Sequence, residues 1–259
     1  MNMRSRAVRL SELNVRIVDP ARAGDAPPEL PDLIVCFAHG YGAPGTDLVP
    51  LAAELVELAP ALARCRFVFP EAPLVPEELG PWGGRAWWPI DLAALERALQ
   101  SGTPRVLADT EPEGLGPARR KLHAALDLAL REAGLGWERL VLGGFSQGAM
   151  LAVDLALRAD EPPAGVVAFS PTLLCEDVWR RHAPRRAGLP VFVSHGRQDP
   201  LLPFFATEAL VGLLADAGIA VDFLAFDGPH TIAMEALERA ARCLVDRLPA
   251  PAASRAAEP

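Results

Sequence analysis

The sequence predicts an α/β fold with a mostly parallel central sheet and helices on both faces. Continuous apolar runs such as LIVCFA (33–38) and LVLGG (140–144) are typical of strands that are covered on both faces. From residue 33 onward, amphipathic segments of helical length separate these runs, so strands and helices alternate. Ligands of such sheets bind beyond the carboxyl ends of the strands, which makes the residues after each strand the candidates for function.

In the first half of the chain, alternating apolar residues at Val8, Leu10, Val15 and Ile17 predict a hairpin of edge strands. The further elements expected there are a loop at 21–31, the strand 33–38, a helix from about residue 46 and the strand 65–69. A long loop at 71–89 follows, and long loops in compact domains are usually functional.

The second half repeats the alternation. Its strands are expected at 140–144, 165–169, 190–194 and 221–226. Its helices are expected at 92–99, 117–133, 147–158, 204–217 and 232–247, with a polar loop at 101–116. Gly134 is a C-cap signal for the helix at 117–133. We expect residues 1–248 to form a single domain and residues 249–259 to form a disordered tail.

Composition limits the classes of function. Hydrophobic residues make up 51 % of the 259 residues and charged residues 22 %, which excludes a disordered chain. The formal net charge of −8 argues against a nucleic-acid partner and against binding to anionic lipid. No run approaches the ~18 apolar residues of a membrane span, and the N-terminus has no signal-peptide core. The sequence leaves a homodimer open.

The cysteines indicate the compartment. The four of them lie far apart and form no CxxC pair, so no metal site is expected: Cys36, Cys65, Cys175 and Cys243. We therefore predict a cytoplasmic protein with free thiols and without stable membrane insertion.

One stretch carries the pattern of a nucleophile. Gly144-Phe145-Ser146-Gln147-Gly148 matches G-x-S-x-G, with an apolar strand before it and an amphipathic helix after it. The glycines remove side chains that would clash in a sharp strand-to-helix turn, and the helix N-terminus favours negative charge near the serine. Ser146 is therefore the predicted nucleophile. The alternative is a glycine-rich turn with an incidental serine.

A serine nucleophile needs an adjacent base, and the chain has five histidines. His123 and His182 lie in charged segments and are expected at the surface. His39 and His195 each follow a strand and precede glycine, and we interpret them as turn histidines bonded to the backbone. His230 lies between the last strand and the last helix, where a loop can carry its imidazole over the sheet. His230 is the predicted base.

The acid that orients this base is expected after an earlier strand. Asp199 follows the strand PVFVS within HGRQDP, and the chain order Ser146, Asp199, His230 is that of the α/β-hydrolase triad. Asp227, three residues before His230, is the alternative. Asp-Gly-Pro is a turn string, so we expect Asp227 to shape the turn.

Acyl transfer also needs hydrogen-bond donors for a tetrahedral oxyanion. The predicted donors are the backbone N–H groups of Gln147 and of Tyr41 in the His-Gly-Tyr-Gly turn. Aromatic residues of the long loop either line an apolar acyl pocket with Phe145 and Met150 or cap the sheet edge: Trp82, Trp87 and Trp88. Four arginines either attract an anionic substrate or, as we expect, form a solvated helix face: Arg180, Arg181, Arg185 and Arg186.

Five stretches resemble the phospholipase/carboxylesterase family, which includes acyl-protein thioesterases and bacterial carboxylesterases. They are FAHGYG (37–42), GRAWWPID (84–91), GFSQGAM (144–150), SHGRQDPLLP (194–203) and PHTI (229–232). The resemblance implies an α/β-hydrolase fold with Ser146, Asp199 and His230 as the triad. It also implies Tyr41 and Gln147 as oxyanion donors, and no cofactor.

We expect a serine esterase that cleaves small-molecule carboxylic esters of short to medium acyl chains. The segment 170–189 is too small to be the large apolar lid of an interfacial lipase. The alternatives are a lysophospholipase or acyl thioesterase with the same triad, or a non-catalytic binding protein of the same fold.

Overall fold

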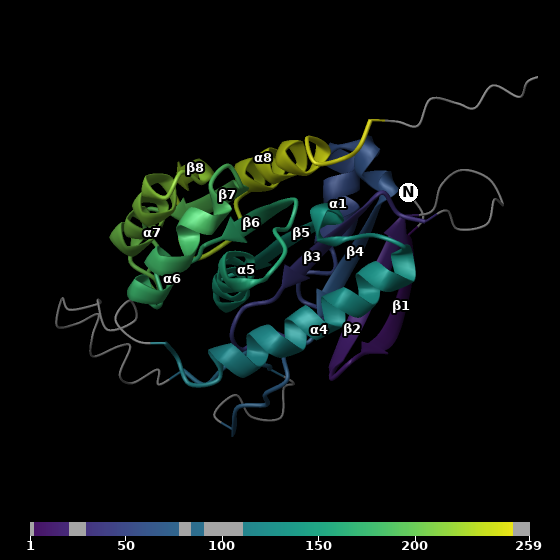
Figure 1. Cartoon of the computed structure of the whole chain (residues 1–259), viewed down its shortest axis with the longest axis horizontal. Helices are drawn as coiled ribbons and strands as arrows, with labels where there is room; N and C mark the ends of the chain where they lie inside the picture. Colours follow the sequence, from purple (N-terminus) through teal and green to yellow (C-terminus); the bar gives the residue numbers. More distant parts are fainter. Residues whose placement is uncertain (1–2, 21–29, 78–83, 91–110, 251–259) are drawn as a thin grey trace, which may run out of the picture.

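An eight-stranded sheet runs through the centre of the molecule in the order β1-β2-β4-β3-β5-β6-β7-β8 (Figure 1). The computed structural model describes residues 3–20, 30–77, 84–90 and 111–250. The strands are β1 (Met3–Leu10), β2 (Leu13–Pro20), β3 (Leu33–Ala38), β4 (Cys65–Pro70), β5 (Leu140–Phe145), β6 (Gly165–Phe169), β7 (Pro190–Gly196) and β8 (Ala220–Phe226). β1 and β2 form the predicted antiparallel hairpin, β2 pairs antiparallel with β4, and every pairing from β4 to β8 is parallel. The predicted fold class is confirmed.

Helices cover both faces of this sheet (Figure 1). They are α1 (Leu51–Leu58), α4 (Leu115–Ala133), α5 (Gln147–Arg158), α6 (Glu176–His182), α7 (Phe204–Asp216) and α8 (Met234–Val245). Short 3-10 turns, η1 (Pro60–Arg64), η3 (Trp137–Arg139) and η4 (Ala183–Arg186), complete the elements of the described residues. As predicted, α4 ends at Gly134, which adopts the left-handed conformation (φ 65°) that glycine tolerates best.

The alternation of side chains along β3 divides the core into two layers. Ile34 and Cys36 face the cluster that contains the buried residues of α4, α5 and α7. Leu33, Val35 and Phe37 face the cluster formed by α1 and α8. All six residues of β3 are buried. The run in the sequence is continuously apolar because both faces of this strand pack against a layer of helices.

Some boundaries differ from those that we predicted. The first helix begins at Leu51 and not near residue 46, because Pro50 has no N–H to donate and stands at the helix N-cap. Hydrogen-bonded turns occupy residues 46–50 instead. β7 continues to Gly196, so His195 lies inside the strand and does not follow it.

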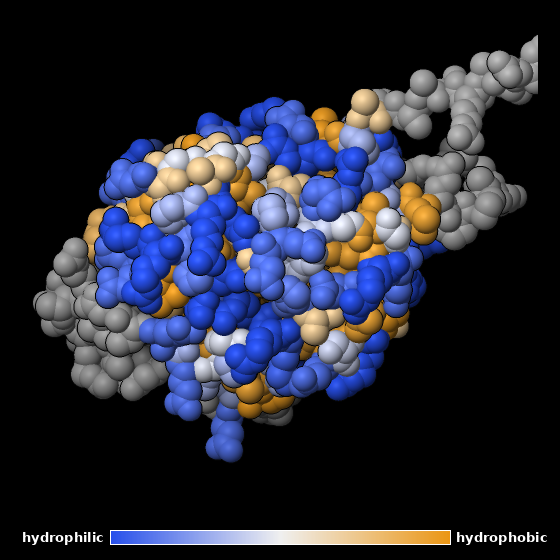
Figure 2. Space-filling view, viewed as in Figure 1, coloured by the Kyte–Doolittle hydropathy of each residue, from blue (hydrophilic) through white to orange (hydrophobic). Residues whose placement is uncertain are grey.

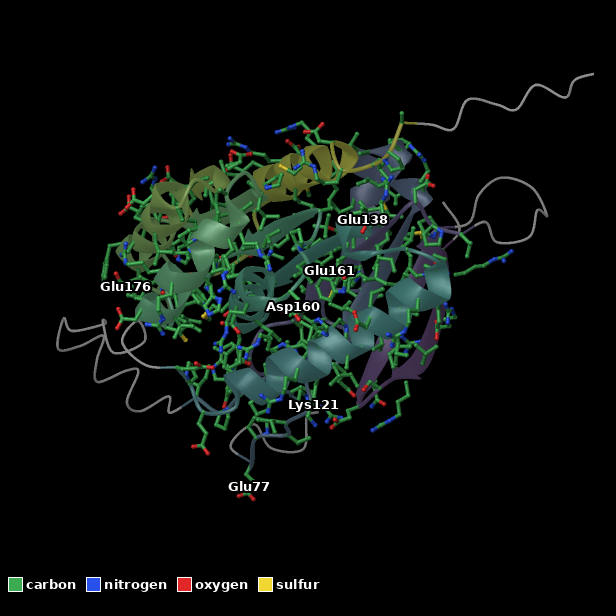
Figure 3. All side chains as sticks on the ribbon, viewed as in Figure 1. Glu77, Lys121, Glu138, Asp160, Glu161 and Glu176 are labelled. Carbon is green, nitrogen blue, oxygen red and sulfur yellow. The ribbon has the colours of Figure 1, made fainter. Side chains whose placement is uncertain are left out.

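The outer surface matches the acidic composition. Glu77, Glu138, Asp160 and Glu161 are exposed, and their side chains stand among the charged groups around the molecule (Figure 3). On the face shown in Figure 2, hydrophilic residues predominate and the hydrophobic ones form small separate patches. Within the described ranges, no helix is both long and apolar enough to cross a membrane. The predicted helix at 92–99, Trp82, most of the loop at 21–31 and the end of the tail lie outside the described residues.

Candidate active site

Ser146 lies at a sharp turn between β5 and α5, where the sequence predicted it. Its backbone angles, φ 54° and ψ −120°, are uncommon for a residue other than glycine. The Ser146 N–H donates to the Phe169 carbonyl at 2.9 Å, which fixes the turn to the end of β6, and its carbonyl accepts from the Met150 N–H at 3.1 Å. The surrounding structure therefore holds the strained residue at the carboxyl edge of the sheet.

The two glycines of the motif are sterically required. A Cβ atom on Gly144 would lie 2.6 Å from the Ala38 carbonyl oxygen, and one on Gly148 would collide with the carbonyls of Ala38 and His39. The end of β3 thus passes directly against the start of α5. Just beyond β3, a Cβ atom on Gly40 would lie 3.4 Å from Cβ of Ser146, so the predicted oxyanion turn adjoins the predicted nucleophile.

His230 and Asp199 are in direct contact. His230 Nδ1 donates to Asp199 Oδ2 at 2.5 Å, and the imidazole packs on the ring of Phe145 with 4.7 Å between centroids. Because Phe145 precedes Ser146, this packing holds the imidazole beside the turn that carries the serine. Asp227, the alternative acid, has an 86 % exposed side chain and pairs with Arg197 at 3.8 Å.

The Asp199 carboxylate is buried and fully bonded. Its side chain is 0 % exposed, and Oδ1 accepts from the Leu201 and Leu202 N–H groups at 2.8 and 2.9 Å. Oδ2 faces His230 and also His195, whose Nε2 lies at 3.2 Å. Burial raises the pKa of Asp199, but the hydrogen bonds from both histidines and from the Leu202 N–H outweigh it and hold the pKa well below its usual range. Asp199 is therefore charged at neutral pH.

The loops that carry Asp199 and His230 are bonded to each other through the backbone. The Arg197 N–H donates to the Phe226 carbonyl at 2.8 Å, and the Gln198 N–H donates to the Gly228 carbonyl at 3.1 Å. A Cβ atom on Gly196 would collide with the carbonyls of Gly228 and Pro229. The glycine of the His-Gly pair thus allows the two loops to meet, which sets the distance between acid and base.

The predicted oxyanion turn is tied to the long loop. The Gly42 N–H donates to the Arg85 carbonyl at 2.8 Å, and the Arg85 N–H donates to the Ala43 carbonyl at 3.1 Å. Tyr41, which lies at this turn, is partly exposed. His39 begins the turn with a buried ring between two backbone groups: Nε2 accepts from the Ala72 N–H at 3.1 Å, and Nδ1 donates to the Gly40 carbonyl at 2.9 Å. His39 is thus the backbone-bonded turn histidine that the sequence indicated.

The side chain of Gln147 has a role that the sequence analysis missed. It is 0 % exposed, its Oε1 accepts from the Trp87 N–H at 2.8 Å, and its Nε2 donates to the Trp88 carbonyl at 2.9 Å. Trp87 Nε1 donates in turn to the His39 carbonyl at 2.9 Å. This amide clamp joins the two backbone segments that carry the predicted oxyanion donors. Only the polarity of Gln147, placed between apolar segments, could have indicated it.

The remaining predicted residues divide between the core and the surface. Trp87 and Trp88 are 1 % and 3 % exposed, and Met150 is buried with them, whereas Phe145 is partly exposed. Arg180, Arg181 and Arg185 are exposed, and Arg180 pairs with Glu176 at 2.7 Å.

Arg186 differs from the prediction of a solvated face. It is buried because it donates to the carbonyls of Ala156 and Ala159, which the end of α5 leaves without partners. None of the four cysteines, all of which lie in the described part of the chain, forms a disulfide, and burial raises the pKa of the Cys175 thiol to about 12. Within the described residues, no three His, Cys, Asp or Glu side chains group in a way that could hold a metal ion.

The sequence of the chain is similar to those of known proteins. Residues 26–245 match the sequence profile of the phospholipase/carboxylesterase family. Acyl-protein thioesterase 1 of Neurospora crassa is 28 % identical over 220 residues, which cover 83 % of this chain and 86 % of the relative. Acyl-protein thioesterase 1 of Eremothecium gossypii is 31 % identical over 174 residues, or 66 % and 68 % of the two chains.

Solved structures agree on the fold. The crystal structure of esterase PE8 superposes with a TM-score of 0.70 at 29 % identity and covers 86 % of this chain and 97 % of its own. The carboxylesterase from Mesorhizobium loti has a TM-score of 0.69 at 20 % identity, over 93 % and 98 % of the two chains. The chain therefore belongs to the phospholipase/carboxylesterase family of the α/β-hydrolase superfamily and is a serine hydrolase that acts on esters or thioesters.

Proposed function

We propose that this protein hydrolyses carboxylic esters of short to medium acyl chains through an acyl-enzyme on Ser146, with His230 as the base and the Asp199 carboxylate orienting it. The observation that carries the proposal is the 2.5 Å contact between His230 Nδ1 and Asp199 Oδ2. An ionised carboxylate only accepts hydrogen bonds, so Nδ1 carries the hydrogen of this contact. Nε2 of the neutral ring then holds a lone pair that can take a proton.

The chemistry proceeds in two halves. Ser146 Oγ attacks the ester carbonyl carbon while His230 Nε2 takes its proton, and the resulting oxyanion accepts from the backbone N–H groups of Tyr41 and Gln147. The tetrahedral intermediate expels the alcohol, which receives the proton from His230. Water then attacks the acyl-enzyme carbonyl while His230 Nε2 takes a proton from it, and the second tetrahedral intermediate expels Ser146 Oγ, which receives that proton from His230 as the acid product leaves. No cofactor takes part in these steps.

The packing of the segment 170–189 supports a substrate smaller than a lipid. Trp179 on α6 is fully buried, and its Nε1 donates to Asp154 on α5 at 2.9 Å. Arg186 fixes the end of the same segment to α5. One side of the segment is thus anchored to α5 while Arg180, Arg181 and Arg185 are exposed, which is unlike the large detachable apolar lid of an interfacial lipase. Trp87 and Trp88, packed behind Gln147, would close the acyl pocket.

Acyl thioesters are the second candidate substrate. Relatives that are named acyl-protein thioesterase 1 align with most of this chain, and the same nucleophile, base and acid would cleave a thioester. A direct comparison decides between the two. We expect kcat/KM for a butyryl or hexanoyl p-nitrophenyl ester to exceed that for the acyl-CoA of equal chain length, and the reverse order would assign the protein to thioesters.

Active-site labelling tests the nucleophile. A fluorophosphonate probe should modify one site, which peptide mapping should assign to Ser146. Labelling at full stoichiometry in Ser146→Ala would refute the assignment.

A further inference from the structure

His195 is a buried histidine that the proposed mechanism does not use. It is the next-to-last residue of β7, and its side chain is 0 % exposed. The ring of Phe204 flanks it with 6.1 Å between centroids. Burying an imidazole costs free energy unless both ring nitrogens find partners, so the identity of these partners shows what the residue does.

One edge of the ring faces the predicted acid. Nε2 lies 2.9 Å from the Leu202 carbonyl oxygen and 3.2 Å from Asp199 Oδ2. Both oxygens only accept hydrogen bonds, so Nε2 carries a hydrogen. That hydrogen is donated to the Leu202 carbonyl and is shared with Asp199 Oδ2 at the longer distance. Asp199 Oδ2 thereby lies between two imidazole N–H groups, those of His195 and His230.

The other edge of the ring is fixed to two further elements. Nδ1 lies 2.9 Å from Oγ1 of Thr207, a buried residue in the first turn of α7. The Thr207 hydroxyl donates its one hydrogen to the Pro171 carbonyl, just after β6, at 2.6 Å, and its oxygen faces Nδ1. The ring of His195 therefore connects the segment after β6, the start of α7 and the loop that carries Asp199.

We propose that His195 is a positioning residue for the Asp199 carboxylate. This inference rests on the proposed function, and it assigns to His195 the orientation of Asp199 and, through Asp199, of His230. The backbone N–H groups of Leu201 and Leu202 hold Oδ1, and His195 is the second donor that holds Oδ2. Without it, the carboxylate can rotate about its Cβ–Cγ bond, and the His230 Nδ1–H loses its fixed acceptor.

Two substitutions at position 195 separate this role from simple packing. His195→Gln keeps an amide N–H that can reach Asp199, whereas His195→Leu keeps volume and removes the donor. We expect His195→Leu to lower kcat by about 10- to 100-fold with KM changed less than about twofold, because a hydrogen bond to a charged group is lost. His195→Gln should recover most of kcat. Equal losses in the two folded variants, or wild-type kcat in His195→Leu, would overturn the proposal.

A matched control lies next to it in the same strand. Ser194 is also 0 % exposed, and its hydroxyl has no hydrogen-bond partner among the described residues. Ser194→Ala should therefore leave kcat unchanged. If His195→Leu does not fold, Thr207→Val tests the same network from its far end. It should lower kcat by about 2- to 10-fold, with recovery in Thr207→Ser, and a Thr207→Val enzyme of full kcat would count against the proposal.

A spectroscopic measurement keeps this inference distinct from the proposed function. The His230 Nδ1–H should give a low-field proton NMR resonance that is absent in His230→Gln. We expect the resonance to shift or broaden in His195→Leu and to return to its wild-type position in His195→Gln. An unchanged resonance in His195→Leu would refute the positioning role even if the protein hydrolyses esters. If the wild-type protein has no esterase activity but the resonance behaves as expected, the proposed function is refuted and the positioning role of His195 is not.

Discussion

His39 and His195 share a local sequence, a buried strand that runs into His-Gly, but their surroundings differ. The two nitrogens of the His39 ring bond only backbone groups: Nε2 accepts from the Ala72 N–H and Nδ1 donates to the Gly40 carbonyl. The His195 ring reaches the Asp199 carboxylate and the Thr207 hydroxyl. One edge of the candidate site is therefore built from backbone groups around a neutral imidazole, and the other from side chains around a buried charge.

The difference follows from what approaches Nε2 of each ring. A backbone N–H makes that nitrogen an acceptor at His39, and burial lowers the pKa of this histidine, so the ring stays neutral. A carbonyl and a carboxylate make the same atom a donor at His195. We infer that the His39 region, which is His39 with the turn at 39–42, shapes the predicted oxyanion turn. The His195 region, which is His195 with Asp199 and His230, holds the buried carboxylate and the predicted base.

The predicted nucleophile, Ser146, lies between the turn at His39 and the loop that follows His195. Its removal should therefore have the largest effect on activity. Ser146→Ala should lower kcat for p-nitrophenyl butyrate by roughly 10⁴-fold or more, because members of a triad act as a unit. Steady-state kinetics on the folded variant measure the effect, with Ser194→Ala as the control. A residual rate above about one hundredth of wild type would mean that another group is the nucleophile.

Neutralising Asp199 tests whether the buried carboxylate beside His195 is the one that supports catalysis. Asp199→Asn should lower kcat by about 10³- to 10⁴-fold, because an amide neither fixes the imidazole tautomer nor stabilises the imidazolium. Asp227→Asn, on an exposed side chain of the neighbouring loop, should change kcat by less than about twofold. The opposite ranking, with both variants folded, would transfer the role to Asp227.

The two regions should lose stability in different ranges of pH. His39 has a pKa below its unfolded value of about 6.5, so the unfolded chain binds the proton more tightly and stability falls as pH drops below about 6.5. The pKa of Asp199 is also lowered, so its contribution is complete above about pH 4 and is lost as pH falls further.

Urea unfolding between pH 3 and 8 measures both losses. His39→Gln should remove the loss of stability that begins below about pH 6.5, which is worth up to about 1.4 kcal/mol per pH unit. Asp199→Asn should remove the loss that begins below about pH 4. At every pH, the free energy of unfolding of each variant is subtracted from that of the wild type. The contributions of other titrating groups, such as His182, then cancel. A His39→Gln difference that is constant from pH 5 to 8 would contradict the neutral, backbone-bonded ring.

The acyl pocket should belong to the His39 region, since the ring of Trp87 packs 5.7 Å from that of His39. Each buried acyl CH₂ contributes up to about 0.8 kcal/mol, so kcat/KM should rise by up to about fourfold per carbon and level off between about C4 and C8. Truncating Trp87 or Trp88 to Ala should move this optimum to longer chains. The control is Trp137, which packs on His123, and Trp137→Ala should leave the optimum unchanged. A rise that continues to palmitoyl esters would contradict the closed pocket.

Much of the framework follows from the sequence alone. The apolar runs at β3 and β5 and the helix at Gln147–Arg158 depend on side-chain periodicity and on glycines within a few residues, so their positions agree with the prediction. The predicted start of α1 was wrong although the local Pro50 decides it, whereas the predicted end of β7 was wrong because a neighbouring strand decides it. β7 extends through His195 because β8 pairs with it as far as Gly196, and no residue inside the segment signals that pairing.

The sequence by itself determined the α/β alternation, the strand-to-helix turn at Ser146 and the order of serine, aspartate and histidine along the chain. Only the tertiary structure decided that Asp199 and not Asp227 bonds His230, that the Gln147 amide clamps Trp87, and that His195 bonds Asp199 while His39 bonds backbone. The physical reason is the range of the interactions. Secondary structure follows from steric and hydrophobic preferences of near neighbours, whereas the partner of a buried polar group is whichever donor or acceptor a distant loop brings within about 3 Å.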